Sequence, residues 1–405
     1  MWAYEMLTGR AALLISKFLV RYAAVQLDDT MPPLTQTDLN RALLARQMLL
    51  ARENISPLKA IERLAGMQAQ QARPPFVGLW TRLGNFQRAE LLKLFHRRRI
   101  VRATGMRATI HLFTARDYLV LRGALQPMLG AVMPPKFIKE LGGVPVRKIV
   151  TSARKFFSGE ARSFKELREW LQPKHPKADY RIAALAVRMN VPLLGVPGDS
   201  PWGFSTNATW TLAEEWLGQS VPAQVNTSAL IKKYLAAFGP ATPADAQTFS
   251  GCKGLRAEFE KLRPQLKVFQ NEKGQELFDL PRAPRPPANT PAPARFIPEF
   301  DNLILAHADR TRIVADEHRP ALITKNLQVP ATFLINGRVA GIWKIERTKK
   351  SATLNIHPFA PLPTKAKAEL KHEGAPLLHF IEPDRMSKNV ILMRRAPIAN
   401  APPAA

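Results

Sequence analysis

Apolar and polar positions repeat with the period of an α-helix along most of the first 250 residues. Thr37 is expected to cap a first helix, in which apolar side chains recur at helical spacing as far as Leu50. Ser56 and Pro57 begin a second helix, and Gly66 ends it. The same spacing predicts further helices over residues 88–96, 114–126, 163–171, 179–189, 211–217, 228–238 and 242–250.

Short extended runs separate several of these helices, notably residues 109–113 and 203–210, which are rich in β-branched or aromatic side chains. Groups of about three helices closed by a short extended pair form a winged-helix unit, and such groups recur here about every 80 to 100 residues. The copies share no strong sequence identity, so the repeat is one of architecture. The pattern predicts winged-helix domains over residues 34–135, 136–225 and 226–280.

The hydrophobic pattern changes after residue 280. Residues 281–294 contain six prolines, which favour an extended, semi-rigid connector. Beyond this connector apolar residues alternate with polar ones, so that strands over 332–335 and 338–346 flank the type I′ turn sequence Asn336-Gly337. Residues 351–359 supply a third strand.

We therefore assign residues 295–396 to a small antiparallel β-barrel or sheet, with a helix near residues 365–372. Residues 397–405 are expected to be a disordered tail, and residues 1–33 an N-terminal extension that is not necessarily native. The predicted fold class is mainly α with β wings: tandem winged-helix domains followed by a small antiparallel β-barrel domain.

The balance of charge restricts the class of partner. Among 405 residues there are 59 Lys and Arg against 32 Asp and Glu, a net charge of +27. So large an excess destabilises a compact fold through self-repulsion unless an anion shares the surface. Nucleic acid and anionic membrane are the two candidate anions.

A membrane is the weaker candidate, because no stretch approaches the roughly 18 uninterrupted apolar residues of a spanning helix. The nearest, residues 11–25, carries Lys17 and Arg21, which also argue against a secretory signal. The single Cys252 excludes an intramolecular disulfide, fits a reducing compartment and is expected to be a buried small hydrophobe. We expect a cytoplasmic, nucleoid-associated monomer.

Common enzyme signatures are missing from the sequence. There is no phosphate loop, no dinucleotide-binding glycine motif, no serine-hydrolase elbow and no zinc-protease motif. Asp316-Glu317-His318 resembles a metal-ligand cluster, but adjacent residues cannot all face one ion from a regular element, so a solvated loop is expected. We predict no metal and no nucleotide cofactor.

Basic side chains concentrate in two stretches. Residues 81–107 hold eight Lys or Arg against one acid, and residues 136–181 hold twelve against five. A charge run is usually only a solvated face, but guanidinium groups offer paired donors that suit phosphate oxygens. The overall charge therefore favours contact with double-stranded DNA. The candidate DNA-binding arginines are Arg73, Arg82, Arg97, Arg98, Arg99, Arg102 and Arg107.

Gln68 and Gln70 follow directly after the predicted end of the second helix. Residues two apart point the same way only when the backbone is extended, so both amides are expected on one side of a loop or strand. On residue type alone, such glutamines are usually surface polar groups.

Two passages change that interpretation. The sequence Leu64-Ala-Gly-Met-Gln-Ala-Gln-Gln-Ala-Arg-Pro-Pro-Phe-Val-Gly-Leu-Trp80, followed by Val101-Arg-Ala-Thr-Gly-Met-Arg-Ala-Thr-Ile-His-Leu112, closely resembles the winged-helix DNA glycosylases of the AlkZ and YcaQ type. The passages 234–242 and 300–310 resemble the same family. The resemblance extends from about residue 34 to residue 361 and leaves out the first thirty residues.

The resemblance implies tandem winged helices curved around DNA, with a β-barrel at the C-terminal end. It also implies a metal-free, monofunctional glycosylase that removes N7-alkylated purines and unhooks interstrand crosslinks made through guanine N7. In that family a Gln-x-Gln motif, or Gln-x-Asp in the other branch, positions the attacking water, which makes Gln68 and Gln70 the catalytic candidates. His111 lies in a matching motif, either touching DNA near the lesion or as a structural histidine.

The expected chemistry agrees with these residue types. A neutral amide is a poor base, but it can hold a water by accepting one hydrogen bond and donating another. An N7-alkylguanine is cationic and leaves without an added proton, so a weak catalyst suffices. The alternative is a winged-helix DNA-binding regulator without catalysis. A protein bound to a membrane surface through residues 1–30 is a third, remote interpretation.

Overall fold

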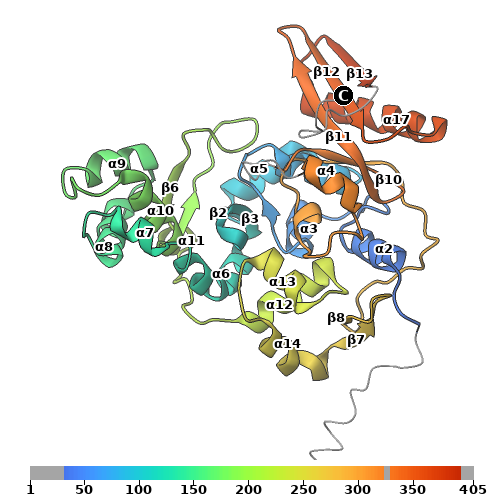
Figure 1. The fold of residues 1–405 in the computed structure, drawn as a ribbon. Coiled ribbons are helices and arrows are strands. Elements are labelled where there is room, and N and C mark those ends of the chain that lie inside the picture. Colours follow the sequence, from blue (N-terminus) through green and yellow to red (C-terminus); the bar gives the residue numbers. More distant parts are fainter. Residues whose placement is uncertain (1–31, 323–328, 394–405) are drawn as a thin grey trace, which may run out of the picture.

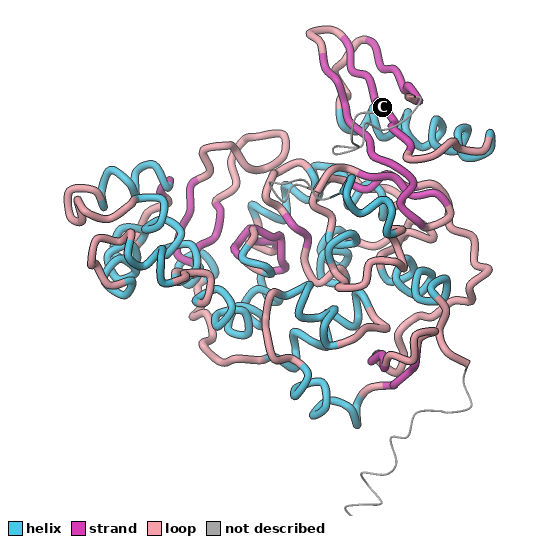
Figure 2. Tube along the Cα trace, viewed as in Figure 1, coloured by secondary structure: helices cyan, strands magenta, loops and turns pink. Residues whose placement is uncertain are grey.

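The computed structural model describes residues 32–322 and 329–393, so nearly all of the N-terminal extension and the whole 397–405 tail lie outside the described residues. Within these ranges the chain forms sixteen α-helices, thirteen strands and three short 3-10 helices. They make a mixed α and β fold with six-stranded, five-stranded and two-stranded sheets. Figures 1 and 2 show a broad, largely helical body, with the C-terminal sheet projecting from it.

The first unit begins with two capped helices. Thr35, two residues earlier than expected, caps the first helix by accepting a hydrogen bond from the backbone of Asp38. Ser56 caps the second helix, and Pro57 is its first residue, as predicted. The elements are α2 (Gln36–Arg46), α3 (Pro57–Arg63), β1 (Met67–Gln68), α4 (Pro74–Arg82), α5 (Arg88–His96), β2 (Ile100–Thr104), the 3-10 helix η1 (Met106–Ala108) and β3 (Ile110–Thr114).

A second unit repeats this order of helix, strand, two helices and two strands. It follows α6 (Ala115–Gly130) and α7 (Pro135–Lys139). Ser163 and Glu166 form a capping box at the start of its second helix. Its elements are α8 (Val146–Phe157), β4 (Arg162–Ser163), α9 (Phe164–Leu171), α10 (Tyr180–Asn190), β5 (Leu193–Gly195) and β6 (Thr209–Leu212), followed by α11 (Ala213–Leu217).

The strands of these two units join into one sheet. Its order is β1-β3-β2-β5-β6-β4, so each unit contributes three adjacent strands, and β2 pairs antiparallel with β5 at the junction. Only two residue pairs form this junction, Arg102 with Gly195 and Ala103 with Leu194. The backbone hydrogen bonds of this pairing fix how the second unit sits against the first.

The third unit follows the same order on a smaller scale. A bridge between Ala241 and Phe278 takes the place of its first strand. Thr242 and Asp245 form a capping box that begins its second helix. The elements are α12 (Thr227–Phe238), α13 (Pro243–Ser250), α14 (Arg256–Leu262), the 3-10 helix η2 (Arg263–Gln265), β7 (Lys267–Gln270) and β8 (Glu276–Asp279).

The proline-rich segment 281–294 runs across α2 and is fixed to it by arginines. The Arg41 guanidinium donates to the carbonyl of Thr290 over 2.6 Å, and that of Arg46 donates to the carbonyl of Pro284 over 3.2 Å. Arg46 also forms a fully buried ion pair with Asp279 at 2.7 Å. The segment therefore packs along the first unit.

The C-terminal part is an open sheet, and the predicted barrel is wrong. The strand order is β13-β12-β11-β10-β9, and the two outer strands, β9 and β13, do not pair. The predicted hairpin is correct, with Asn336 and Gly337 at φ 47° and 78° in its turn. Its elements are β9 (Arg295–Ile297), α15 (Asn302–Leu305), η3 (Asp316–His318), α16 (Arg319–Leu322), β10 (Thr332–Ile335), β11 (Arg338–Arg347), β12 (Ser351–Pro358), α17 (Thr364–Ile381) and β13 (Ser387–Leu392).

The reason that the sheet stays open is the long helix α17. It connects β12 to β13, so β13 returns parallel to β12 rather than antiparallel. Leu370, Leu377 and Leu378 of α17 are buried in the same apolar cluster as Phe296 and Phe333 of the sheet. The helix thus covers the apolar face that a barrel would have enclosed.

Candidate active site

Gln68 lies on β1, the short strand that follows the second helix. Its Cα is paired with that of His111 on β3, and the Ala69 N–H donates to the carbonyl of Ile110 over 2.7 Å. Gly66, at φ 92°, makes the turn that leads from the helix into the strand. The extended backbone expected for the Gln-x-Gln segment is therefore present up to Ala69.

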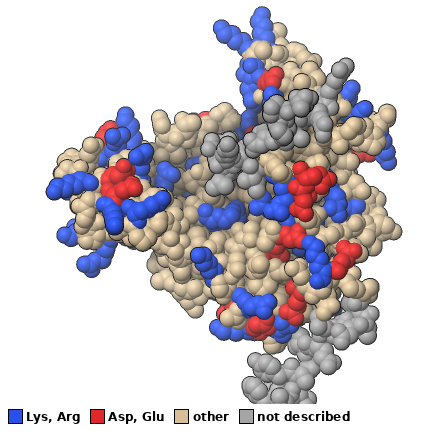
Figure 3. Space-filling view, in the orientation of Figure 1, with Lys and Arg blue, Asp and Glu red and all other residues tan. Residues whose placement is uncertain are grey.

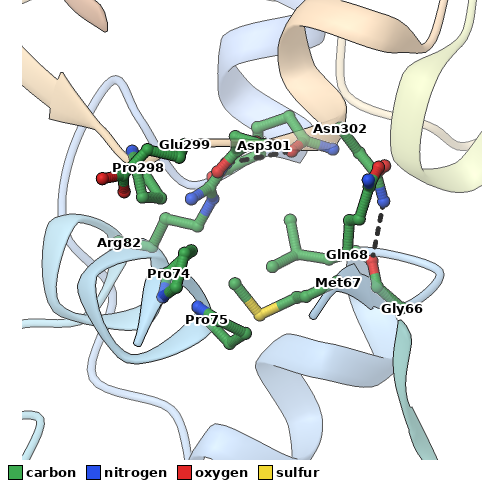
Figure 4. A pocket seen from close by; sticks show the side chains of 12 residues that line it. Gly66, Met67, Gln68, Pro74, Pro75, Arg82, Pro298, Glu299, Asp301 and Asn302 are labelled. Carbon is green, nitrogen blue, oxygen red and sulfur yellow. Dashed lines mark hydrogen bonds and ion pairs between the residues drawn. The ribbon is translucent and has the colours of Figure 1, made fainter. Parts of the chain in front are cut away.

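A network of side chains holds the Gln68 amide. Nη2 of Arg107 donates to Oε1 of Gln68 over 2.9 Å and to Oδ1 of Asn302 over 2.8 Å. Nη1 of Arg107 donates to the carbonyl of Phe249. The Asn302 amide donates to the carbonyl of Gly66 (Figure 4). Because a guanidinium can only donate, the atom of the Gln68 amide that faces Arg107 must be its oxygen.

A cavity beside Gln68 is narrow, and its lining is partly polar. It has a volume of about 10 Å³, which is at the lower limit for one water molecule. Gln68, Glu299 and Asn302 line it, and Figure 4 shows Gln68 on the opposite side from the ion pair of Arg82 and Asp301. A single small nucleophile is the only species that a space of this size accommodates.

Arg107 has a strained backbone in η1, the turn between β2 and β3. Its φ of 53° is in the left-handed region, which a side chain with a Cβ rarely adopts. Such strain costs on the order of 1–3 kcal/mol and persists only where surrounding contacts impose it. Burial, and secondly the positive charge of Arg310, lower the pKa of Arg107 to about 10. Arg107 thus remains cationic at neutral pH and serves to position Gln68.

His111 is completely buried behind Gln68 and does not reach a surface where DNA could contact it. Burial, and secondly the charge of Arg107, lower its pKa to about 3. Its Nδ1 lies 3.1 Å from the carbonyl of Thr109. The structural alternative for His111 fits this position: a neutral ring within the core of the first unit.

Gln70 lies in different surroundings. It is exposed, and its Oε1 accepts a hydrogen bond of 3.3 Å from the Ile110 N–H. It lines a groove of about 1210 Å³ between the first unit and the β5–β6 loop of the second. The structure therefore puts Gln70 in a wide groove and Gln68 in a separate, narrow cavity.

The groove has a basic lining. Arg73, Arg102, Lys165 and Arg188 lie along it, against the single acid Glu166. Arg73 pairs with Glu299 over 2.8 Å. On the face drawn in Figure 3, other Lys and Arg side chains gather over the lobe of α7 to α10 and at the end of the C-terminal sheet.

Arg82 does not take the DNA-binding place that its sequence suggested. Its side chain is 1% exposed and forms an ion pair of 2.9 Å with Asp301. Its other donors bind the backbone carbonyls of Gln47 and Gly78. The run of basic residues in the sequence did not indicate that Arg82 is internal, because this depends on the residues inside the protein to which Arg82 is bound.

Arg97, Arg98 and Arg99 are exposed in the turn between α5 and β2. The Arg98 guanidinium stacks on Trp216 with 4.3 Å to the ring centroid and donates to the Trp216 carbonyl. None of the three lines the groove at Gln70. Contact with DNA through this turn stays a prediction.

Arg102 is almost fully buried and supports the motif itself. Nε donates to the carbonyl of Ala69 over 3.1 Å, and Nη2 donates to the carbonyl of Gln70 over 3.3 Å. The guanidinium also stacks over Phe204 of the second unit. Arg102 thus connects the Gln-x-Gln backbone with the second unit.

Sequence reasoning missed Asn302 and Phe249, which complete the network around Arg107. Both are distant in sequence from Gln68. No local motif marks Phe249, whereas Asn302 lies in the passage 300–310 that resembles the family but to which no role was assigned. In the same passage, His307 is buried and its Nε2 lies 3.0 Å from the Phe238 carbonyl, while Asp309 pairs with Lys273.

Residues 32–322 and 329–393 contain no group of three or more His, Cys, Asp or Glu that could hold a metal ion. In the same ranges no helix is both long and apolar enough to cross a membrane.

Comparisons with known proteins support an enzyme that acts on DNA. Residues 61–380 match the sequence profile of the family described as DNA glycosylase AlkZ-like. Among solved structures, the Streptomyces sahachiroi DNA glycosylase AlkZ aligns with a TM-score of 0.71 at 20% identity, covering 89% of this chain and 100% of that one. The comparison with curated proteins finds no match.

The fold and the profile together define the class of DNA glycosylases, enzymes that hydrolyse the bond between a base and its sugar. Because the profile covers most of the chain, including Gln68, Gln70 and His111, the protein belongs to the AlkZ-like DNA glycosylase family. The resemblance identified in the sequence is confirmed.

Proposed function

We propose that this glycosylase removes cationic N7-alkylated purines from double-stranded DNA and unhooks interstrand crosslinks made through guanine N7. The observation that carries the proposal is the chemistry of the Gln-x-Gln segment. Its two glutamines, Gln68 and Gln70, have neutral amide side chains that carry no ionisable group. Their oxygens already accept hydrogen bonds from Arg107 and from the Ile110 N–H. A site of this kind positions a water and does not activate it.

The orientation of Gln68 defines how the water is held. Its NH₂ group donates to the water oxygen, which fixes the water's position and leaves its protons free for other acceptors. Such positioning lowers the entropic part of the barrier but removes no proton. The departing base must therefore be activated already, and a cationic N7-alkylpurine meets this requirement.

The three repeated units fit winged helices that together hold a duplex. In each unit the order of helices and strands is the same, and the groove at Gln70 lies between the first two. We propose a monofunctional enzyme with water as the nucleophile, acting as a monomer near the nucleoid without a metal or nucleotide cofactor. The basic groove favours DNA phosphates on its lining.

A DNA-binding regulator without catalysis is the second candidate. It would bind undamaged duplexes with a clear sequence preference, whereas a glycosylase binds them with little preference and steep salt dependence. The strained Arg107 favours the enzyme, because strain of this kind is concentrated at functional sites.

The test is release of 7-methylguanine from methylated duplex DNA under single-turnover conditions. We expect Gln68→Ala and Gln70→Ala each to slow release about 100-fold, since a misplaced nucleophile has effects of this order. Gln71→Ala is the matched control, because Gln71 lines the same groove next to the motif and should keep the wild-type rate. Equal rates for all three variants and wild type would contradict the assignment.

A further inference from the structure

Arg188 on α10 lacks the partners that a half-buried arginine normally has. Among the described residues it forms no ion pair and no side-chain hydrogen bond, and its Nε is buried without a partner. Its guanidinium stacks on the ring of Phe164, at 4.2 Å to the centroid. Buried charges are usually paired, because removing them from water is costly.

A second guanidinium lies close to it. Arg102 lines the same groove and uses Nε and Nη2 for the carbonyls of Ala69 and Gln70. Its Nη1 has no hydrogen-bond partner among the described residues. Burial, and secondly the positive charge of Arg188, lower the pKa of Arg102. The two cations therefore repel each other.

The other charged groups of the groove do not compensate this repulsion. Glu166 accepts hydrogen bonds from the backbone and hydroxyl of Ser163 as part of the α9 capping box. Arg73, the remaining groove arginine, is paired with Glu299. The groove therefore contains two unneutralised guanidinium groups that an anion from outside would stabilise.

We propose that Arg188 and Arg102 together bind one backbone phosphate of the DNA strand that carries the lesion. Guanidinium groups present planar pairs of donors that match a phosphodiester's two free oxygens. Because Arg102 also binds the Gln70 carbonyl, a phosphate at this site fixes the DNA backbone at a set distance from the motif. The assignment rests on the proposed function and identifies Arg188 as a positioning residue.

The experiment measures affinity for a duplex that contains one stable abasic-site analogue. In a matched series, single linkages within a few nucleotides of the analogue are replaced by neutral methylphosphonates. We expect Arg188→Gln to weaken binding of the all-phosphate duplex about tenfold, as for loss of a charged hydrogen bond. On the duplex whose partner linkage is neutral, the same variant should bind as wild type does. The salt dependence, d log K/d log[salt], should flatten by about 0.9.

Arg263→Gln is the matched control for loss of one positive charge, because Arg263 is already paired with Glu260 and Glu276. Arg188→Lys keeps a charge in the groove and should retain a methylphosphonate-sensitive affinity, which guards against a folding defect in Arg188→Gln. An equal loss of affinity on every duplex in the series, or no loss, overturns the proposal.

Free phosphate is the other possible source of this anion. If the site serves free phosphate, calorimetry with inorganic phosphate will show binding that Arg188→Gln abolishes, with no dependence on any DNA linkage, and the proposal fails. Affinity requires no base release, so this test is separate from that of the proposed function. An inactive wild-type chain that still shows the linkage dependence would contradict the glycosylase proposal and leave the phosphate site standing.

Discussion

The guanidinium of Arg107 and the amide of Gln68 are joined by a hydrogen bond of 2.9 Å, across 39 residues of sequence. The bond decides which end of the amide faces Arg107. It also connects the motif to Asn302 and to the Phe249 carbonyl, two groups supplied by other parts of the chain. The predicted catalytic glutamine is thus oriented by Arg107, which was predicted to bind DNA from its charge alone.

Replacing Arg107 by Met should slow base release about 10- to 100-fold at saturating DNA, because the Gln68 amide would lose its fixed orientation. The Kd for DNA should stay near that of wild type. Single-turnover rates and anisotropy measure the two quantities. Arg122→Met is the control, since Arg122 is also removed from solvent and donates to Gln126 and to the Met189 carbonyl, outside the site. A loss of affinity without loss of rate in Arg107→Met would refute the positioning role.

Replacing Arg82 by Leu should lower the free energy of unfolding by about 3–5 kcal/mol, because Asp301 would be left buried without its partner. Chemical denaturation measures this loss. The exposed Arg98 and Arg99 should show the reverse. Replacing both by Gln should hardly change the free energy of unfolding, but it should make DNA affinity less dependent on salt concentration. If Arg82→Leu is stable and binds DNA poorly, the interpretation of Arg82 as a structural residue fails.

Acid should destabilise the protein through two buried histidines. Burial is the main cause that lowers the pKa of both His111 and His307 to about 3, against 6.5 for the unfolded chain. Between pH 3 and pH 6.5 the unfolded state binds more protons than the folded state. The stability that depends on keeping both histidines neutral is therefore fully present above pH 6.5 and is lost as the pH falls toward 3. Each histidine contributes a slope of up to about 1.4 kcal/mol per pH unit. Denaturation of wild type, His111→Gln and His307→Gln from pH 7 to 4.5 should show a shallower slope in each variant.

Neutral bases should remain in the DNA. With amides alone in the motif, the enzyme cannot protonate a departing uracil or hypoxanthine, and release of either should be undetectable in an assay that detects 7-methylguanine readily. Duplexes that differ only in the one base make the comparison direct. Robust release of either neutral base would overturn the view that the leaving group must already be activated.

Much of the local structure could be predicted from the sequence. Ser56-Pro57 begins a helix where expected, and Asn336-Gly337 forms the hairpin turn, because capping and turn geometry depend on neighbouring residues alone. The barrel was wrong for a complementary reason. The strand Ser387–Leu392 was not predicted, and no local pattern shows that the chain returns over α17 so that this strand pairs in parallel with β12.

The candidate site shows the same division. The glutamines were found through the family motif, whereas their surroundings depend on contacts between distant segments. Arg82 and Arg98 belong to one charge run, yet a carboxylate 219 residues away determines that Arg82 is internal. Arg188 was missed because an isolated arginine in an amphipathic helix has no distinguishing local pattern.

The short antiparallel junction between β2 and β5 has a geometric consequence for the enzyme. Strands allow changes of register only in steps that keep their side chains on the same face, which means two residues, or about 7 Å. A change of register at Arg102 and Gly195 would therefore displace the second unit by about 7 Å relative to Gln70. The spacing between Gln70 and the second unit is thus set in discrete steps by a pair of strands, and it does not change gradually through surface substitutions.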